Sequence, residues 1–130
     1  AGMNLYGNDM DESVSPLESG LAWTLVLDEE RDFIGATALR KQQQDGPSWR
    51  QSGILLEDRG VLRAGQRIVT PVGEGVVTSG TFSPTLKRSI GLARLPVAAD
   101  SLQVDVRGKL LAARCVNPPF VRHGQIKIDL

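Results

Sequence analysis

Residues 78–96 read TSGTFSPTLKRSIGLARLP and combine hydroxyl side chains, a proline and two adjacent cations within otherwise strand-like sequence. Hydroxyls beside cations suit a catalytic loop or the lip of a binding site. They also suit a tight corner between two strands, because Gly and Ser-Pro supply turn geometry. We favour an architectural corner made by Ser79, Gly80, Ser83 and Pro84, and we keep direct substrate contact as the alternative.

His123 and Cys115 are the next side chains that could do chemistry. No serine or cysteine stands in an arrangement that would make His123, the single histidine, a general base, so we expect an exposed surface residue. Cys115 alternates with apolar neighbours and is expected to be a small core residue. No group of His, Cys and carboxylates has the spacing of a metal site. The sequence therefore predicts no catalytic residue and no metal ligand.

Three weaker signals remain open to two interpretations each. Asp9, Asp11 and Glu12 could act as acid and base if burial separated their pKa values, but we favour a solvated acidic loop. Tyr6 could stack on a planar ligand, although a core position is favoured. VGEGVV, residues 72–77, resembles a phosphate loop, but β-branched residues follow where a helix would have to begin, so a hairpin turn is predicted.

Charge is divided unevenly along the chain although its net charge is zero. Residues 1–46 carry nine acidic and three basic side chains, or −6, whereas residues 47–130 carry six acidic and twelve basic ones, or +6. This asymmetry could help the two parts dock, or could make the basic part the seat of an anionic ligand. The alternative is that both parts are solvated surfaces, because long-range fields say little about fold.

Composition also limits the classes of partner. The basic residues of the strand-like part are not interleaved with exposed aromatics, so we expect no nucleic-acid binding. No apolar run approaches the roughly 20 residues that span a bilayer, so we expect no membrane insertion. The chain shows no signal-peptide pattern and has one cysteine, which predicts a reducing, cytoplasmic location.

Two short helices are predicted in residues 1–46, which we call the lead-in. Ser15 can cap a helix over residues 17–25, LESGLAWTL, with Glu18 completing a capping box, and this apolar helix is expected to be buried. Asp32 can cap a second helix over residues 33–44, FIGATALRKQQQ, with cations in its last turn.

The pattern changes from helical to alternating after DGPS at residues 45–48, where we place the domain boundary. Gly, Pro, Asp and Asn turns separate the strands that follow, and Gly108 is expected at a hairpin turn. Regular spacing of short strands predicts a mostly β fold, a small antiparallel six-stranded Greek-key-type barrel over residues 47–130. The six predicted strands are 52–58, 66–72, 73–80, 88–95, 101–108 and 109–116.

Five motifs in order along the chain resemble the C-terminal portion of the T-protein family of the glycine cleavage system, which are aminomethyltransferases. They are AGMNLYGNDMDESVSPLESGLAWTL, RDFIG, GVLRAGQ, TSGTFSPTLKRSIGLARLP and PPFVRHG. The resemblance implies a three-domain cloverleaf whose last domain is a β-barrel. It also implies that residues 1–46 end the preceding folate-binding domain, and that residues 47–130 form the C-terminal domain.

The resemblance implies a reaction as well. The family takes an aminomethyl group from the lipoylated H-protein, releases ammonia and passes the one-carbon unit to tetrahydrofolate. Its catalytic aspartate and the GYTGE and ARD motifs that hold folate would lie upstream of Ala1, so we expect a C-terminal fragment that is inactive alone. The family's tail reaches the glutamate end of folate, which makes Arg122, His123 and Lys127 the candidate cofactor-binding residues.

Expected partners are the lipoylated H-protein and the N-terminal domains of the parent protein. Self-association is a further possibility, because unpaired edges near the first residues invite pairing with another copy. Two alternatives stay open: the folate-binding domain of a related dehydrogenase or demethylase, and a free-standing module that binds an acidic protein or a polyglutamylated folate.

Overall fold

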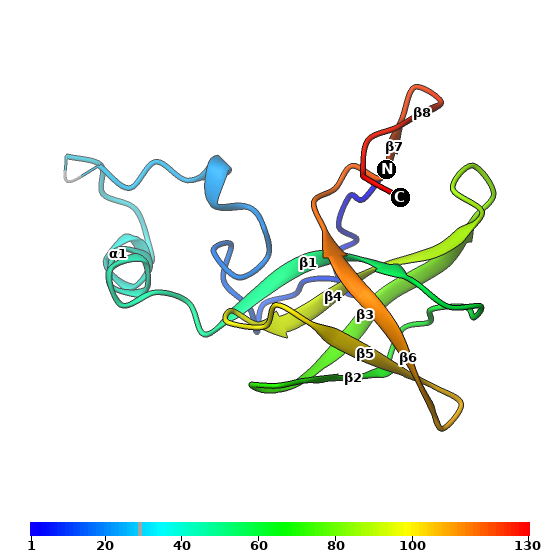
Figure 1. Ribbon diagram of the computed structural model, residues 1–130. Coiled ribbons are helices and arrows are strands. Elements are labelled where there is room, and N and C mark those ends of the chain that lie inside the picture. The colour runs from blue at the N-terminus through cyan, green and yellow to red at the C-terminus, as the bar shows by residue number, and fades with distance from the viewer. Residues whose placement is uncertain (29) are drawn as a thin grey trace.

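The computed structural model describes residues 1–28 and 30–130, and six of its strands close into an antiparallel barrel (Figure 1). The order around the barrel is β1-β4-β3-β2-β5-β6, and β1 pairs with β6 to close the ring. Because β2, β3 and β4 are consecutive neighbours and β1 lies beside β4, the arrangement is a Greek key and the predicted fold class is confirmed. The strands are β1 (Trp49–Leu56), β2 (Arg67–Thr70), β3 (Gly73–Ser83), β4 (Arg88–Pro96), β5 (Leu102–Val106) and β6 (Lys109–Val116).

Alternation along the strands fills the barrel interior with apolar side chains. In β5, Leu102 and Val104 are buried and Gln103 between them is exposed, the period-2 pattern of a half-buried strand. Full burial of one such side chain contributes about 1.5–3 kcal/mol. The interior cluster is Ile54, Leu56, Leu62, Ile68, Val77, Ala93, Leu95, Ala99, Leu102, Val104, Leu111 and Ala113.

A second, smaller cluster covers the outside of β1. Leu55 belongs to it, although Ile54 and Leu56 on either side belong to the interior cluster. Phe120, from the tail after β6, is also a member and is 2% exposed. The tail is therefore packed onto the barrel by its own aromatic side chain.

The tail continues as a small hairpin that the sequence did not predict. Strands β7 (Val121–Arg122) and β8 (Gln125–Ile126) pair antiparallel, and the Lys127 amide donates to the Phe120 carbonyl at 2.9 Å. His123 and Gly124 form the turn with positive φ values of 51° and 74°. Figure 1 shows this hairpin projecting from one side of the barrel, beside both chain termini.

The predicted corner in residues 78–96 starts later than expected. Ser79 and Gly80 lie inside β3, and the turn occupies residues 84–87, so the prediction was wrong for these two residues. A Cβ on Gly80 would lie 2.6 Å from backbone atoms of Leu62, which shows that glycine here permits the β1–β2 loop to pack against β3. Ser83 accepts a hydrogen bond from the Leu86 amide at 3.3 Å and starts the turn, an architectural role.

The first predicted helix of the lead-in does not form. The amide of Glu18 donates to Ser15 Oγ and the amide of Ser15 to the Glu18 carboxylate, each at 3.3 Å, so the capping box is present. Turns follow it, with Gly20 at a φ of 69°, before a short 3-10 helix, η1 (Ala22–Thr24). This segment is not buried either, since Trp23 is 83% exposed.

The second predicted helix forms with a different start. Helix α1 (Ala36–Asp45) has Gly35 as its N-cap at a φ of 90°, so Asp32 is not the cap. Arg40 lies in the middle of the helix and not in its last turn, and its guanidinium donates to the carbonyls of Leu27 and Asp28. In Figure 1, α1 lies to the left of the barrel and apart from it.

Candidate functional site

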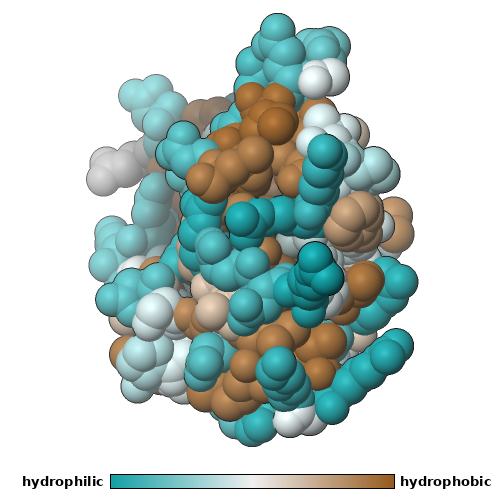
Figure 2. All heavy atoms as spheres, turned by 45° about the vertical axis from the view of Figure 1, so that its right-hand side comes forward, coloured by the Kyte–Doolittle hydropathy of each residue, from teal (hydrophilic) through white to brown (hydrophobic). Residues whose placement is uncertain are grey.

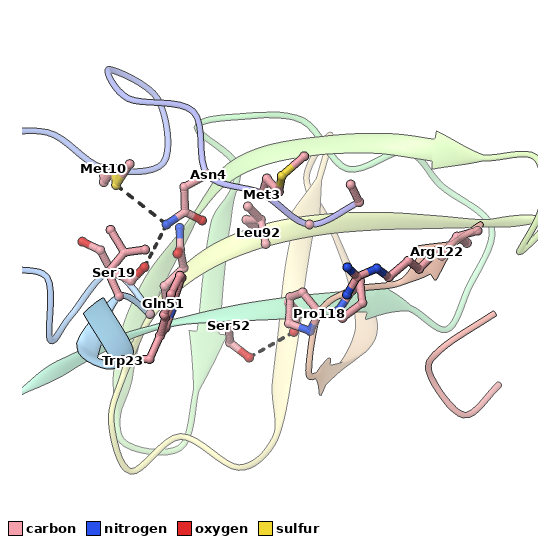
Figure 3. Close-up of a pocket in the computed structure, with 17 residues that line it drawn as sticks. Met3, Asn4, Met10, Ser19, Trp23, Gln51, Ser52, Leu92, Pro118 and Arg122 are labelled. Carbon is pink, nitrogen blue, oxygen red and sulfur yellow. Dashed lines mark hydrogen bonds between the residues drawn. The ribbon is translucent and has the colours of Figure 1, made fainter. Parts of the chain in front are cut away.

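A cavity of about 660 Å³ opens between the start of the lead-in and one side of the barrel (Figure 3). Its volume falls within the range of small-molecule sites, roughly 300–1,000 Å³. Apolar side chains dominate the lining, with a few amides, hydroxyls and one cation among them. Its main side chains are Met3, Asn4, Met10, Ser19 and Trp23 from the lead-in, Gln51 and Ser52 from β1, Leu92 from β4, and Pro118 and Arg122 from the tail.

Asn4 makes contacts within the lead-in at this cavity, and Gln51 joins the lead-in to the barrel. Asn4 Nδ2 donates to the Ser19 carbonyl at 2.8 Å and contacts the Met10 sulfur at 3.8 Å. The Gln51 backbone amide donates to the Glu18 carbonyl at 2.9 Å, and its Nε2 donates to the Asp9 carbonyl at 3.4 Å. Asn4 and Gln51 therefore lie in the wall with their positions set by backbone carbonyls.

The acidic stretch of the lead-in is divided between barrel contact and solvent. Asp9 is half-buried and accepts a hydrogen bond from Thr78 Oγ1 at 2.6 Å, so the expected solvated loop is wrong for this residue. Asp11 and Glu12 are exposed as expected. The side chain and amide of Ser13 both donate to Asp11, and with attraction from Arg94 they hold the pKa of that carboxyl below its ordinary value.

One of the three predicted cofactor residues lines the cavity. Arg122 lines the cavity, and Figure 3 shows it at the edge opposite Trp23. His123 and Lys127 are exposed and belong to the same terminal hairpin, but they lie outside the lining. A surface position for His123 is confirmed. Cofactor binding by Arg122, His123 and Lys127 stays a prediction.

Other sequence-based expectations have mixed outcomes. Tyr6 is 67% exposed, so the core position predicted for it is wrong. Cys115 is half-buried and packs against the interior cluster, and Arg50 Nη2 lies 3.6 Å from its sulfur. Among residues 1–28 and 30–130, no group of three or more His, Cys, Asp or Glu could hold a metal ion. None of the described helices is long and apolar enough to cross a membrane.

One end of the barrel gathers cations. The β1–β2 loop, the β3–β4 turn and the β5–β6 turn all lie on the right-hand side of the barrel in Figure 1, and Figure 2, which turns that side forward, shows hydrophilic side chains projecting between apolar patches. Arg88 and Arg114 both pair with Glu57. Five exposed cations form no ion pair with any residue the structure describes, and we call them the basic end: Arg59, Arg63, Lys87, Arg107 and Lys109.

Sequence reasoning missed most of the cavity. Asn4 and Gln51 are ordinary polar residues whose importance depends on contacts between segments far apart in the chain. The exposure of Trp23 could have been predicted, because Gly20 interrupts the helix that was expected to bury this side chain. The incorrect helix prediction is the reason that Trp23 was not proposed as a cavity residue.

The family model of the glycine cleavage T-protein C-terminal barrel domain matches residues 50–122. An aminomethyltransferase of Xanthomonas campestris pv. campestris (strain 8004) is 52% identical over 96% of this chain, which covers 34% of that protein. An aminomethyltransferase of Xylella fastidiosa (strain M12) is 52% identical over 100% of this chain and 36% of its own length. The chain thus spans about a third of the length of these relatives.

A solved structure gives the same result for the fold. The crystal structure of glycine cleavage system aminomethyltransferase T from Bartonella henselae superposes with a TM-score of 0.85 at 32% identity. The match covers 98% of this chain and 37% of that one. Since almost the whole chain is included, the similarity extends to both walls of the cavity and not to the barrel alone.

Proposed function

Since this chain belongs to the glycine cleavage T-protein C-terminal barrel family, we propose that it serves as the barrel-bearing part of a folate-dependent aminomethyltransferase in glycine catabolism. The observation that carries the proposal is 52% identity to aminomethyltransferases over 96% of the chain, lead-in included. The relatives named above are not dehydrogenases or demethylases, so that alternative is not favoured.

The proposed reaction moves an aminomethyl group from the lipoyl arm of the H-protein to tetrahydrofolate and releases ammonia. Among the described residues no group could hold a metal ion, and we assign this chain a role in binding and positioning. We expect the 130 residues alone to be inactive. A reducing, cytoplasmic compartment suits the free thiol of Cys115.

The cavity residues fit tetrahydrofolate, which supplies the acceptor nitrogens for the one-carbon unit. Trp23 offers an aromatic face, Met3 and Leu92 offer apolar surface, and Asn4 offers an amide. Arg122 would pair with a carboxylate of the glutamate end. His123 and Lys127, on the same hairpin, would lie within reach of further glutamates.

A chimera tests the proposal directly. The part of the Xanthomonas campestris relative that precedes its matched region would be joined to this chain. We expect folate-dependent ammonia release from aminomethylated H-protein within about tenfold of the natural enzyme, since half of the residues are identical. The upstream part alone and this chain alone serve as controls. A folded but inactive chimera, or turnover by this chain alone, would contradict the proposal.

We place the H-protein contact at the basic end of the barrel. Five exposed cations there lack an ion-pair partner among the described residues, so an acidic surface could approach without displacing an existing pair. Arg59→Glu with Lys87→Glu in the chimera should raise KM for the H-protein about tenfold or more, with the larger effect at low salt. Lys41→Glu, an exposed cation of α1 outside both proposed contact surfaces, is the matched control. Equal KM values in both variants would argue against this surface.

The lead-in would pack against the rest of the preceding folate-binding domain of the parent protein, whose end it would form. Trp23, Val26, Phe33 and Ile34 are exposed apolar side chains of this region, with Ile34 at 104% of the reference exposure. Exposed apolar groups of this kind are typical of an interface. Limited proteolysis tests this assignment: residues 22–35 should be cut in the isolated chain and protected in the chimera.

A further inference from the structure

Residues 1–21, which we call the strap, form one wall of the cavity and meet the barrel side at three places. At the start of the strap, Gly2 is so close to the tail that a Cβ would lie 2.5 Å from Pro118 Cβ. At its end, the Glu18 carbonyl accepts a hydrogen bond from the Gln51 amide at 2.9 Å. Between them, Thr78 Oγ1 donates to Asp9 Oδ1 at 2.6 Å, and Gln51 Nε2 donates to the Asp9 carbonyl at 3.4 Å. The Thr78–Asp9 bond joins two side chains, so it can be altered without changing the backbone.

Thr78 occupies an irregular position in β3. Val77 pairs with Ala93 and Ser79 pairs with Leu92, so Thr78 is the extra residue of a β-bulge. Bulges change the direction in which a side chain points. Here the Thr78 hydroxyl lies 3.1 Å from the Leu92 carbonyl and 2.6 Å from the Asp9 carboxylate. The interruption of the strand thus coincides with the point where the strap is held.

The Asp9 carboxylate joins the barrel to the strap's own turn. Its Oδ2 accepts a hydrogen bond from the Leu5 amide at 3.0 Å, while its Oδ1 accepts the one from Thr78. Leu5 directly follows Asn4, whose side chain lines the cavity and binds the Ser19 carbonyl. One carboxylate therefore connects the bulge of β3 with the turn of the strap that follows Asn4.

We propose that Asp9 is a positioning residue: bonded to Thr78, it latches the strap in the place that forms the cavity wall. Release of this latch loosens the middle of the strap between its two end contacts and widens the cavity, while the barrel keeps its own interior cluster and stays folded. The role as a positioner of ligand rests on the proposed function, but the latch itself is a property of the 130-residue chain.

Backbone hydrogen exchange of the 130-residue chain tests the latch. Thr78→Val removes the hydroxyl and keeps the shape of the side chain. Amides that bond within the strap, such as those of Gly7 and Asp9, should exchange about tenfold faster, because a hydrogen bond to a charged group is stronger than one between neutral groups. Amides between β3 and β4 should keep their rates. Thr78→Ser should restore the slow exchange.

Thr81→Val is the matched control, since Thr81 lies on the same strand and its exposed hydroxyl makes a 3.5 Å contact to Phe82. Asp9→Asn keeps an acceptor but loses the charge, so its strap amides should exchange at intermediate rates. The latch would be overturned if Thr78→Val or Asp9→Asn left the exchange rates of the strap amides unchanged. It would also be overturned if the barrel amides exchanged faster by the same factor as the strap amides.

Kinetics of the chimera separate the latch from the proposed function. Thr78→Val should raise KM for tetrahydrofolate about tenfold and leave kcat within about twofold, because the strap shapes the binding wall and not the reacting groups. If Thr78→Val made the strap amides exchange faster but left KM for tetrahydrofolate unchanged, the positioning role would be overturned. An inactive parent chimera would instead count against the proposed function, and the exchange result would stand independently.

Discussion

Helix α1 ends at Asp45 and strand β1 begins at Trp49, yet the two neighbouring elements lie in very different surroundings. From Ser52 to Leu56 every residue of β1 is buried, whereas α1 buries Ala36 and leaves most of its surface in solvent. Barrel strands find their apolar partners within the chain. The lead-in has apolar side chains without such partners, and polar contacts hold its first part in place. Its shape therefore depends on a few bonds, and the barrel's shape depends on many buried side chains.

Truncation of a core side chain should destabilise the barrel strongly. Leu95 is 0% exposed in the interior cluster, so Leu95→Ala should lower the free energy of unfolding by about 2–5 kcal/mol. Ile34→Ala in the lead-in should change it by less than about 0.5 kcal/mol, because that side chain is fully exposed. Urea unfolding followed by circular dichroism measures both. A similar loss in the two variants would show that the lead-in shares the barrel's core.

A buried hydroxyl gives the next largest effect. Ser89 is 2% exposed, accepts a hydrogen bond from the Leu62 amide at 2.8 Å and donates to the Thr81 carbonyl at 2.9 Å. Ser89→Ala should lower the free energy of unfolding by about 1–3 kcal/mol, because the buried Leu62 amide loses its partner. Thr81→Ala, at an exposed position of the same sheet, is the control. Equal stability of Ser89→Ala and the unaltered chain would mean that the β1–β2 loop is not fixed by this bond.

The barrel could be predicted from the sequence because its signals are local and repeated. Each strand carries its own alternation, as Leu102, Gln103 and Val104 show, and each hairpin has its own turn residue, such as Gly108 with a φ of 83°. The hairpin β7–β8 escaped prediction since its position depends on Phe120 entering a cluster beside β1. A two-residue strand offers too little alternation to be recognised alone.

The lead-in shows why local signals can mislead. Its capping box forms between Ser15 and Glu18, yet turns follow, because a cap stabilises a helix only when apolar packing sustains the next turns. The cavity was still harder to predict. Asp9 and Thr78 are 69 residues apart in sequence, and the residues around neither of them indicate that the two side chains are in contact. Arg122 entered the prediction through family resemblance and not through any pattern of its own.

Self-association of the isolated chain should depend on the exposed apolar side chains of the lead-in. With Trp23, Val26, Phe33 and Ile34 exposed, the isolated chain should form weak dimers at high micromolar concentration. Ile34→Lys should weaken dimer formation about tenfold, since a charge would enter the contact. Sedimentation equilibrium measures the change. Phe82→Lys, at an exposed apolar site of the barrel, is the matched control, and an equal effect there would assign the contact to the barrel.

The smallest effect concerns one solvated carboxyl of the lead-in. Ser13 donates to Asp11 from its hydroxyl and its amide, which holds the pKa of Asp11 below the ordinary value of 3.8. A lowered pKa in the folded state means that the stabilisation is complete above the ordinary value and is lost as the pH falls through the folded one. Carbon-13 NMR titration of the Asp11 carboxyl should find its midpoint below 3.8, and Ser13→Ala should return it towards that value. A midpoint at or above 3.8 in the unaltered chain would show that the turn from Asp11 to Ser13 is open in solution. The strap would then be less ordered than the barrel even where the bond between Asp9 and Thr78 holds it.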